Sequence, residues 1–389
     1  MYRLIRRIDN VKSKFQVFRS GVICQIEILI EERPGKADDI FREKQLIMDD
    51  KIIVYGDTDT SYEAEIIEDQ VFIGADINNN NVVFNLKGEI LVKKNEGESY
   101  VFYEIYGDQL GIDKKYLLRL FIDNNGRRFD VIDKDMNVIL HLDHPVWWGA
   151  VVMFDEYFII CQTQKSFTAY HFPNKTRLWD CDISHFGTYI SYSAELETKV
   201  SYFVGYYAQS IYVLLTNETL IEIDIHTGKI TYQWNEMRSC VFDKNRGRIV
   251  GFKLLSSGRD LLNKRYTVNL DTKEQHVDDI SEYFIGLDIR ELEINRETPI
   301  IGEHMFCVFR TRKTPMDWNY GPKSGLMAYN LQTDKVDWQY FVEEGTFASY
   351  PKVAGDRIYI LNGSLHELWI FEKSKTSYTQ TNINKKRVK

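Results

Sequence analysis

Proline, cysteine and long apolar runs are scarce in this sequence, and each scarcity narrows the classes of protein that the chain can form. Only seven prolines occur among 389 residues, and no segment rich in proline, glycine and serine divides the chain. No run of eighteen apolar residues is present, so we expect no membrane-spanning helix. The basic residues near the N-terminus precede no continuous apolar region or cleavage site, so we expect no secretory signal.

The five cysteines are odd in number and widely spaced, and they form neither a CxxC motif nor a disulfide framework. Cys24, Cys161 and Cys307 lie in alternating apolar segments, which indicates small core residues. Free thiols and the lack of a secretory signal are together typical of a reducing compartment. The expected localisation is therefore cytoplasmic.

Positive charge is in deficit. The chain has 49 lysines and arginines against 57 acidic residues, which gives a formal net charge of −8. A nucleic-acid-binding domain usually presents a basic face, so we expect no nucleic-acid partner. An acidic chain of this kind suits a partner protein that is basic.

Motifs of catalysis and cofactor binding are also missing. The sequence has no GxSxG, P-loop or GxGxxG motif in a strand-to-helix context. His141 and His144 lie three residues apart, but zinc needs three or four converging ligands, and no HExxH motif accompanies this pair. We therefore predict no catalytic residue, no metal and no cofactor. The abundant carboxylates keep one alternative open, a hydrolase or lyase that acts on a small molecule or sugar in a central channel.

A short repeat of predicted strands occupies most of the chain. Its clearest copy consists of apolar runs at 211–215 and 220–223, then Asp224, a turn at 227–229, and Trp234. The polar residue after the second apolar run recurs at Asn85, Asp133, His171, Asp224, Asn269, Asn330 and Glu372. The steps between these positions are 48, 38, 53, 45, 61 and 42 residues by subtraction. A period in this range built from short strands is typical of a β-propeller.

Each copy alternates apolar and polar residues, as a half-buried strand requires. The Asp or Asn that follows can bind backbone N–H groups two residues further on, and Gly88, Asn137 and Gly228 stand where a left-handed backbone is easiest to adopt. Because one four-stranded blade cannot bury both of its faces, the copies must stack in a ring. The sequence therefore predicts a single all-β domain over residues 1–389, a seven-bladed β-propeller of four-stranded antiparallel blades.

An N-terminal strand is expected to close the ring. Residues 13–30 contain a well-alternating segment, so we assign them to a closing strand or hairpin that completes the last blade. Residues 31–60 are a charged lead-in, 61–372 form the blades, and 373–389 are a polar tail. Two alternatives stay open, namely a separate strand pair outside the ring and an eighth blade that uses residues 45–55.

The copy at 211–234 resembles the repeat of the quinoprotein-like (PQQ-like) β-propellers in its Ile-Asp-x-x-Thr-Gly-Lys segment and its later tryptophan. Residues 354–360 resemble the start of the same repeat, and Trp179-Asp180 is similar to the signature dipeptide of WD-repeat propellers. The resemblance implies the propeller fold, with degenerate repeats. Quinoprotein dehydrogenases are typically exported, and many carry adjacent cysteines beside the cofactor. This chain has no Cys-Cys pair and no consistent docking tryptophan with a glycine partner, so we expect no bound quinone.

Long steps in the repeat mark insertions, and insertions in propellers fall in loops that often bind other molecules. Aromatic residues in such loops are typical interface anchors because they combine a large apolar area with a polar tip. These loops, together with the segment between Asp133 and His171, supply five candidate partner-binding residues: Trp147, Trp148, His185, Trp318 and Tyr320. The alternative for Trp318 is burial beneath its own loop.

The predicted function is non-catalytic protein binding, with an enzyme as the less favoured interpretation. The partner is expected to be another protein, of basic character, and the chain is expected to be a monomer in isolation. In the bacterial setting that the resemblance implies, such a propeller is similar to a scaffold subunit or to an immunity protein that neutralises a toxin. A third hypothesis, an accessory domain of a larger assembly, also stays open.

Overall fold

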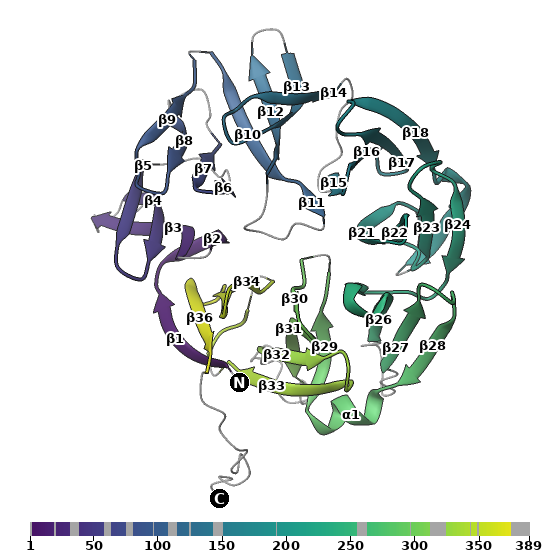
Figure 1. Ribbon diagram of the computed structural model, residues 1–389. Coiled ribbons are helices and arrows are strands. Elements are labelled where there is room, and N and C mark those ends of the chain that lie inside the picture. Colours follow the sequence, from purple (N-terminus) through teal and green to yellow (C-terminus); the bar gives the residue numbers. More distant parts are fainter. Residues whose placement is uncertain are drawn as a thin grey trace, which may run out of the picture.

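The described residues form eight four-stranded antiparallel blades, which follow one another around a ring in the computed structural model (Figure 1). The structure describes residues 2–18, 21–31, 39–57, 64–74, 81–95, 97–107, 115–123, 126–142, 151–191, 193–254, 263–295, 297–311, 324–342, 344–347 and 350–374. We number the blades 1 to 8 in chain order. Within a blade the strands succeed one another from the centre of the ring to its rim (Figure 1).

Blades 1 to 4 are built from the first half of the chain. Blade 1 contains β2 (Val11–Phe18), β3 (Gly21–Glu31), β4 (Asp39–Met48) and β5 (Ile52–Asp57). Blade 2 contains β6 (Ala64–Ile67), β7 (Gln70–Ile73), β8 (Asn81–Asn85) and β9 (Ile90–Lys93). Blade 3 contains β10 (Ser99–Glu104), β12 (Leu117–Asp123), β13 (Gly126–Ile132) and β14 (Val138–Leu142). Blade 4 contains β15 (Val151–Phe154), β16 (Tyr157–Thr163), β17 (Ser166–His171) and β18 (Thr176–Asp182), with β11 (Tyr106–Gly107) parallel to β15.

Blades 5 to 8 complete the ring. Blade 5 contains β21 (Val200–Tyr207), β22 (Ser210–Leu215), β23 (Leu220–Asp224) and β24 (Ile230–Trp234). Blade 6 contains β25 (Val241–Asp243), β26 (Arg248–Leu254), β27 (Asn263–Asn269) and β28 (Gln275–Asp279). Blade 7 contains β29 (Ile289–Glu293), β31 (His304–Thr311), β32 (Ser324–Asn330) and β33 (Lys335–Phe341), with β30 (Ile300–Ile301) beside β31. Blade 8 contains β34 (Lys352–Ala354), β35 (Arg357–Asn362), β36 (Glu367–Lys373) and β1 (Tyr2–Ile8).

A few elements lie in the connections between blades. A separate hairpin, β19 (Thr188–Ser191) and β20 (Ala194–Glu197), stands between blades 4 and 5. The helix α1 (Ser281–Gly286) joins blade 6 to blade 7. Short 3-10 turns occupy Ser184–Phe186 and Lys244–Arg246.

The polar residue at the end of the third strand organises the turn to the fourth strand in five blades. In blade 5, Asp224 Oδ1 accepts hydrogen bonds from the backbone N–H groups of His226 at 3.1 Å and Thr227 at 2.8 Å. His171 and Glu372 bind charged side chains instead. The predicted turn residues are therefore confirmed at Asn85, Asp133, Asp224, Asn269 and Asn330.

The left-handed residue of this turn is not always the one that the sequence suggests. Gly88 and Gly228 have φ values of +87° and +69°, as predicted. The prediction for Asn137 is wrong, because the neighbouring Met136 adopts the left-handed conformation with φ +65°. Asp133 accounts for this shift. Its backbone N–H donates to the Asn137 carbonyl and its Oδ1 accepts from the Asn137 N–H, which holds Asn137 at the pairing position after the turn.

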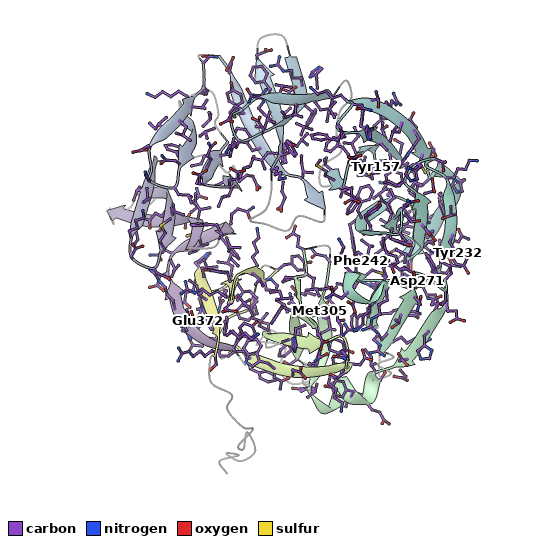
Figure 2. All side chains as sticks on the ribbon, in the orientation of Figure 1. Tyr157, Tyr232, Phe242, Asp271, Met305 and Glu372 are labelled. Carbon is purple, nitrogen blue, oxygen red and sulfur yellow. The ribbon has the colours of Figure 1, made fainter. Side chains whose placement is uncertain are left out.

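Apolar side chains gather between neighbouring blades. The described residues form eight apolar clusters, each drawn from two consecutive blades and the segment that joins them. One cluster joins blade 8 to blade 1 and contains Val11 and Val22 together with Tyr359 and Ile370. Figure 2 shows how side chains fill these spaces around the ring, with Met305 among them. The stacking that the repeat predicts is therefore complete.

All five cysteines are free and buried. Cys24, Cys161 and Cys307 are confirmed as core residues, and Cys181 and Cys240 join them. Burial disfavours the charged thiolate, which raises the pKa of the Cys24 thiol to about 12 and that of the Cys181 thiol to about 11. These side chains therefore stay protonated at neutral pH and behave as small apolar groups.

The first strand of the chain closes the ring. β1 pairs antiparallel with β36 in six residue pairs, from Tyr2 with Lys373 to Ile8 with Leu368. A bulge after Leu4 turns the side chains over, so Tyr2 and Leu4 pack toward blade 7 and Ile8 packs toward blade 1. The prediction that an N-terminal strand closes the ring is confirmed.

The assignment of that strand and the count of seven blades are wrong. The described residues among 13–30 belong to β2 and β3 of blade 1, and those of the supposed lead-in at 31–60 contribute β4 and β5 of the same blade. The alternative of an eighth blade over residues 45–55 is confirmed. The repeat is hidden in blade 1 because β4 begins with charged residues and the turn to β5 uses Asp49 and Asp50 in place of glycine.

Tryptophans on the fourth strand join consecutive blades at the rim. Trp179 Nε1 donates a hydrogen bond to the Ile225 carbonyl of blade 5 at 2.7 Å, and its ring covers Gly228, where a Cβ would lie 2.5 Å from the ring. Trp234 Nε1 donates in the same way to the Lys273 carbonyl of blade 6 at 3.0 Å. Blades 4 and 5 therefore carry docking tryptophans, and only the first of them lies over a glycine. In the second case a lysine with φ +63° takes the place of the glycine, which hides the pattern.

The contact between Trp179 and Gly228 can be tested with a matched pair of glycine substitutions. Gly228→Ala should lower the free energy of unfolding by roughly 2–4 kcal/mol, because it adds both left-handed strain and a clash with the indole ring. Gly355→Ala should cost only about 1–2 kcal/mol, because its φ of +60° is similar but no atom lies within 4 Å of the added Cβ. Urea unfolding of both variants measures the difference. Equal losses would show that the indole contributes nothing to the interface.

Candidate interaction surface

The predicted partner-binding residues divide into two groups. Trp147, Trp148, Trp318 and Tyr320 all lie outside the described residues. His185 is described, and it lies exposed on the 3-10 turn that precedes β19. The structure therefore places one of the five candidates, and its surroundings define the surface described below.

His185 lies in a long connection between blades 4 and 5, which we call the arm (residues 183–199). By subtraction the arm spans 17 residues between the end of β18 at Asp182 and the start of β21 at Val200. The corresponding connection from Trp234 to Val241 spans only six residues. The arm contains the 3-10 turn, the hairpin of β19 and β20, and little else.

The base of the arm is fixed to both blades. Ile183 is fully buried in the cluster between blades 4 and 5, and its N–H donates to the Lys165 carbonyl at 2.9 Å. Thr198 is also buried, and its N–H donates to the Gly187 carbonyl at 2.9 Å. On the far side, the Val200 N–H donates to the Gln164 carbonyl at 2.8 Å. The arm therefore leaves the ring from a rigid platform.

The tip of the arm is exposed. Thr188 pairs with Glu197 and Ser191 pairs with Ala194, so the two strands form a regular ribbon. Ile190 has a relative exposure of 72%, the largest among the large apolar side chains of the described chain, and Leu196 has 43%. An isolated hairpin is marginally stable in water, so the ribbon depends on its base.

Polar contacts arrange one face of the ribbon. Thr188, Ile190, Glu195 and Glu197 share this face, because directly opposite residues point to the same side. Thr188 Oγ1 donates to Glu195 Oε1 at 2.7 Å, and Lys165 Nζ lies 2.8 Å from Glu197 Oε1. The hydrogen bond from Lys165 lowers the pKa of the Glu197 carboxyl. Ile190 therefore shares its face of the ribbon with the carboxyl groups of Glu195 and Glu197.

The turn that carries His185 is held from below. Asp182 Oδ1 accepts a hydrogen bond from the Ser184 N–H at 2.6 Å, and hydrogen bonding from Ser184 lowers the pKa of this carboxyl. The His185 ring lies against Phe186, with 4.4 Å between the ring centroids. Phe186 in turn packs against the cluster between blades 4 and 5. His185 is thus presented to solvent on an ordered support.

Sequence reasoning selected His185 and missed the apolar residues beside it. Ile190 and Leu196 each alternate with polar residues, on either side of Tyr192-Ser193, which is the pattern of a two-residue hairpin. In the sequence this pattern cannot be told from one more buried blade strand. Only the ring itself shows that the hairpin lies outside a blade.

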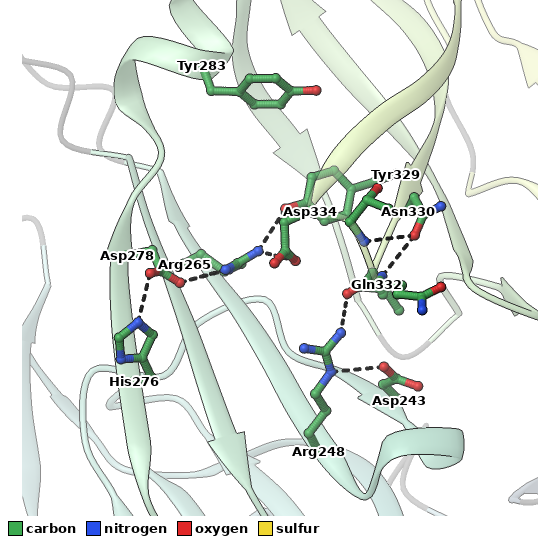
Figure 3. A network of polar contacts seen from close by, with 12 residues as sticks. Asp243, Arg248, Arg265, His276, Asp278, Tyr283, Tyr329, Asn330, Gln332 and Asp334 are labelled. Carbon is green, nitrogen blue, oxygen red and sulfur yellow. Dashed lines mark hydrogen bonds and ion pairs between the residues drawn. The ribbon is translucent and has the colours of Figure 1, made fainter.

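The other polar clusters join strands or blades together. In Figure 3, Arg265 on β27 donates from Nη2 to Asp278 Oδ2 at 2.6 Å and from Nη1 to the Tyr329 hydroxyl at 3.2 Å, and it forms an ion pair with Asp334. The last two residues belong to blade 7. Burial raises the pKa of the Asp278 carboxyl, but the hydrogen bonds and positive charges of Arg265 and His276 together outweigh burial and lower it overall. The cluster is a clamp between blades 6 and 7.

A second part of this clamp centres on Asp243. This carboxylate is buried, and its Oδ2 accepts hydrogen bonds from Arg248 Nε at 3.0 Å and from Arg246 Nη1 at 3.1 Å. Arg248, drawn beside Asp243 in Figure 3, also donates to the carbonyl of Leu331 in blade 7. Both guanidinium groups are therefore used to position strands and turns.

His141, considered above as a metal ligand, belongs to a third cluster. Its Nδ1 lies 2.8 Å from Asp130 Oδ1, and Asp130 Oδ2 accepts a hydrogen bond from Arg119 at 2.7 Å. His144 lies outside the described residues. In the part of the chain that the structure describes, no three His, Cys, Asp or Glu residues converge as metal ligands. Within the same part, no helix is long and apolar enough to cross a membrane.

Comparison with known proteins supports the fold alone. No protein-family model matches the sequence, and no curated protein matches it. The computationally designed protein Ika8 is similar in structure with a TM-score of 0.50 and 10% identity, over 95% of this chain and 98% of that chain. The WD40 domain of SCAP from fission yeast gives a TM-score of 0.48 and 8% identity, over 95% and 97%. BamB from Moraxella catarrhalis gives 0.43 and 8%, over 97% and 100%. The chain is a β-propeller with degenerate repeats, as the resemblance to quinoprotein-like and WD-repeat propellers implies.

The Asp130 cluster makes a prediction about pH. Burial raises the pKa of the Asp130 carboxyl, but hydrogen bonds from His141, Arg119 and Arg128 and the charge of Arg119 together outweigh it and hold the pKa below its ordinary value. A carboxyl of this kind stabilises the fold above its unfolded pKa of about 3.9, and the contribution is lost as the pH falls through the folded pKa. Asp130→Asn should lower the free energy of unfolding at pH 7 by about 3–5 kcal/mol, because it leaves Arg119 buried without its charge partner.

Chemical denaturation over a series of pH values checks this result. Below pH ~4 the free energy of unfolding of the wild-type protein should fall as Asp130 becomes protonated. The Asp130→Asn variant lacks this carboxyl, so its free energy of unfolding should fall less over the same pH range. Asp135→Asn, at an exposed residue in the next turn, should change the free energy of unfolding by less than about 0.5 kcal/mol. If the two variants behave alike, the buried carboxylate does not hold the blade together.

Proposed function

We propose that this protein is a non-catalytic, protein-binding β-propeller that holds its partner on the arm. The observation that carries the proposal is the exposure of Ile190, at 72%, on a ribbon whose base is anchored in the core. Single exposed apolar residues are common on protein surfaces, but Ile190 and Leu196 protrude together on a ribbon outside the ring, and covering them would remove apolar area from water. A partner protein that covers the tip would bury it at little further cost in ordering, because the platform is already rigid.

The chemistry around the arm favours a protein partner. Ile190 on one face of the ribbon and Leu196 on the other each offer an apolar side chain to pack against, and His185 adds an aromatic group with polar nitrogens on the same arm. Glu195 and Glu197 add negative charge, in keeping with the net charge of −8 on the whole chain. These features favour a partner with basic residues.

Within this proposal the chain works in the cytoplasm, is monomeric by itself, and acts as a scaffold subunit or as an immunity protein that neutralises a toxin. Five buried free thiols suit a reducing compartment. A basic partner suits an acidic binder, since opposite charges raise the rate of encounter. The polar clusters that shift pKa values at Asp130 and Asp278 fit a structural role, because each ties together the strands around it.

The test is affinity purification of the tagged protein from its native cells, with quantitative mass spectrometry. The wild-type protein should recover a partner in stoichiometric amount, and the double variant Ile190→Asp with Leu196→Asp should reduce that recovery by about tenfold or more. The matched control is Tyr232→Asp with Val277→Asp. Tyr232 has a relative exposure of 44% and Val277 has 46%, which are close to the 43% of Leu196. Tyr232 lies on the rim of the ring (Figure 2).

Both double variants should stay folded under the conditions of the purification, which urea unfolding checks, since all four residues are exposed. The control also loses the contact of the Tyr232 ring with Trp234, so its unfolding midpoint should fall slightly. Recovery of the partner by the arm variant, or recovery of the wild-type chain with no partner at all, contradicts the proposed function. Loss of the partner in both double variants would place the interface on the rim instead.

A further inference from the structure

We infer that the arm binds its partner by strand addition, taking an extended basic segment of another protein along the free edge of β20. This inference rests on the proposed function and adds to it the mode of binding and the chemistry of the segment. The argument starts from the backbone of the ribbon, then considers the charge on its edge.

The hydrogen-bonding pattern of the ribbon decides which backbone groups point outward. Gly187 and Thr198 form a hydrogen-bonded pair at the base, since the Thr198 N–H donates to the Gly187 carbonyl. Hydrogen-bonded and non-bonded pairs alternate along an antiparallel ribbon. The pairs Thr188–Glu197 and Ile190–Glu195 are therefore the non-bonded ones, and the N–H and C=O groups of these residues face away from the ribbon.

These outward groups are open to another chain. In the described part of the protein β19 and β20 form a sheet of two strands only, and Thr188, Ile190, Glu195 and Glu197 are all exposed. Open edges are protected by short strands, charged side chains, proline, bulges or covering segments, and β20 has the first two of these, which disfavour a like-charged strand but not a basic one. The register between β19 and β20 runs without a bulge, and neither strand contains proline. The ribbon is therefore suited to accept a third strand.

Charge selects the edge and the occupant. β20 presents Glu195 and Glu197, whereas β19 has no charged residue. A second copy of this chain that paired through β20 would set carboxylates against carboxylates, which is unfavourable in neighbouring strands. Lys165 already contacts Glu197 at 2.8 Å, which shows that a basic side chain can reach this face of the ribbon. The fitting occupant is a foreign strand with lysine or arginine opposite Glu195 and Glu197.

Strand alternation fixes the rest of the occupant. Residues of the added strand that lie beside Glu195 and Glu197 share their face, and the residues between them share the face of Leu196. Leu196 is exposed and apolar, so the intervening residues should be apolar too. The segment is therefore an extended one in which basic and apolar residues alternate.

The probe for this inference is a fluorescein-labelled nine-residue peptide of alternating lysine and valine, with a glutamate–valine peptide as its control. Fluorescence anisotropy should show binding of the first peptide and not of the second. Glu195→Gln removes the charge and keeps the outward N–H, whereas Glu195→Pro removes both. The proline variant should bind the peptide about three- to tenfold more weakly than the glutamine variant, because it lacks one edge hydrogen bond.

Proline is tolerated at this position because the Glu195 N–H takes no part in pairing with β19. The matched control on the other edge is Ile190→Pro compared with Ile190→Ala, and these two should bind the peptide equally. Hydrogen exchange of the wild-type protein gives a second readout that needs no variant. The peptide should slow exchange at the Glu195 and Glu197 amides and leave the Thr188 and Ile190 amides unchanged.

Each contrary outcome is distinct. A wild-type protein that fails to bind the peptide, or proline and glutamine variants that bind equally, overturns strand addition on β20. The free protein could instead self-associate, and the double variant Ile190→Asp with Leu196→Asp could abolish that association. This result would make a second copy the occupant and would also overturn the inference. If the native partner is lost from that double variant but retained by Glu195→Pro, the proposed function stands and this inference fails. If the double variant and Glu195→Pro both retain the native partner, the proposed function and this inference are both wrong.

Discussion

Mutual burial of blade faces is the constraint on which the rest of this structure depends. Each blade is apolar on both sides and too thin to shield either, so every blade needs two neighbours. Eight apolar clusters among the described residues meet this need, and the cluster around Val11 and Tyr359 shows that it is met where the ends of the chain come together. The pairing of β1 with β36 follows from the same requirement.

The arm depends on this packing as well. Ile183 and Val200, which stand at its two ends, both belong to the cluster between blades 4 and 5. Trp179 and Gly228 join the same two blades at the rim. An exposed ribbon can therefore keep a defined orientation without a core of its own. Polar clamps such as the one at Arg265 also join strands and neighbouring blades. Among the described connections, the arm is the one that carries protruding apolar side chains.

Much of the ring could be predicted from the sequence because turn chemistry is local. Asp224 and its four counterparts organise their turns through contacts within three or four residues, which a pattern of residues can reveal. The eighth blade was predictable only as an alternative over residues 45–55, because β4 begins with charged residues and is followed by Asp49 and Asp50 in place of glycine. The strand that closes the ring could not be predicted for a different reason. Tyr2 pairs with Lys373 at the other end of the chain, and local sequence patterns do not reveal so distant a partner.

The candidate site was predictable only in part. His185 could be selected as an aromatic residue in an insertion, but exposure of Ile190 depends on where the ring ends and the arm begins. The outward direction of the Glu195 N–H depends on strand register, which the sequence leaves undefined when both strands alternate. Alternation of apolar and polar residues predicts a strand, but it does not show whether one edge of that strand is left without a pairing partner.

Closure by β1 also has a consequence for how the chain matures. Arg3 pairs with Glu372, which is 369 residues away by subtraction. During synthesis the first strand leaves the ribosome long before its partner exists, so it must wait while seven other blades form. Pairing over such a distance is slow, because the entropy cost of closing a very long loop must be met before any stabilising contact forms. The ring therefore acquires its final stability as a late, single event, and until then the open blades 8 and 1 expose edges and apolar faces that a chaperone would have to protect.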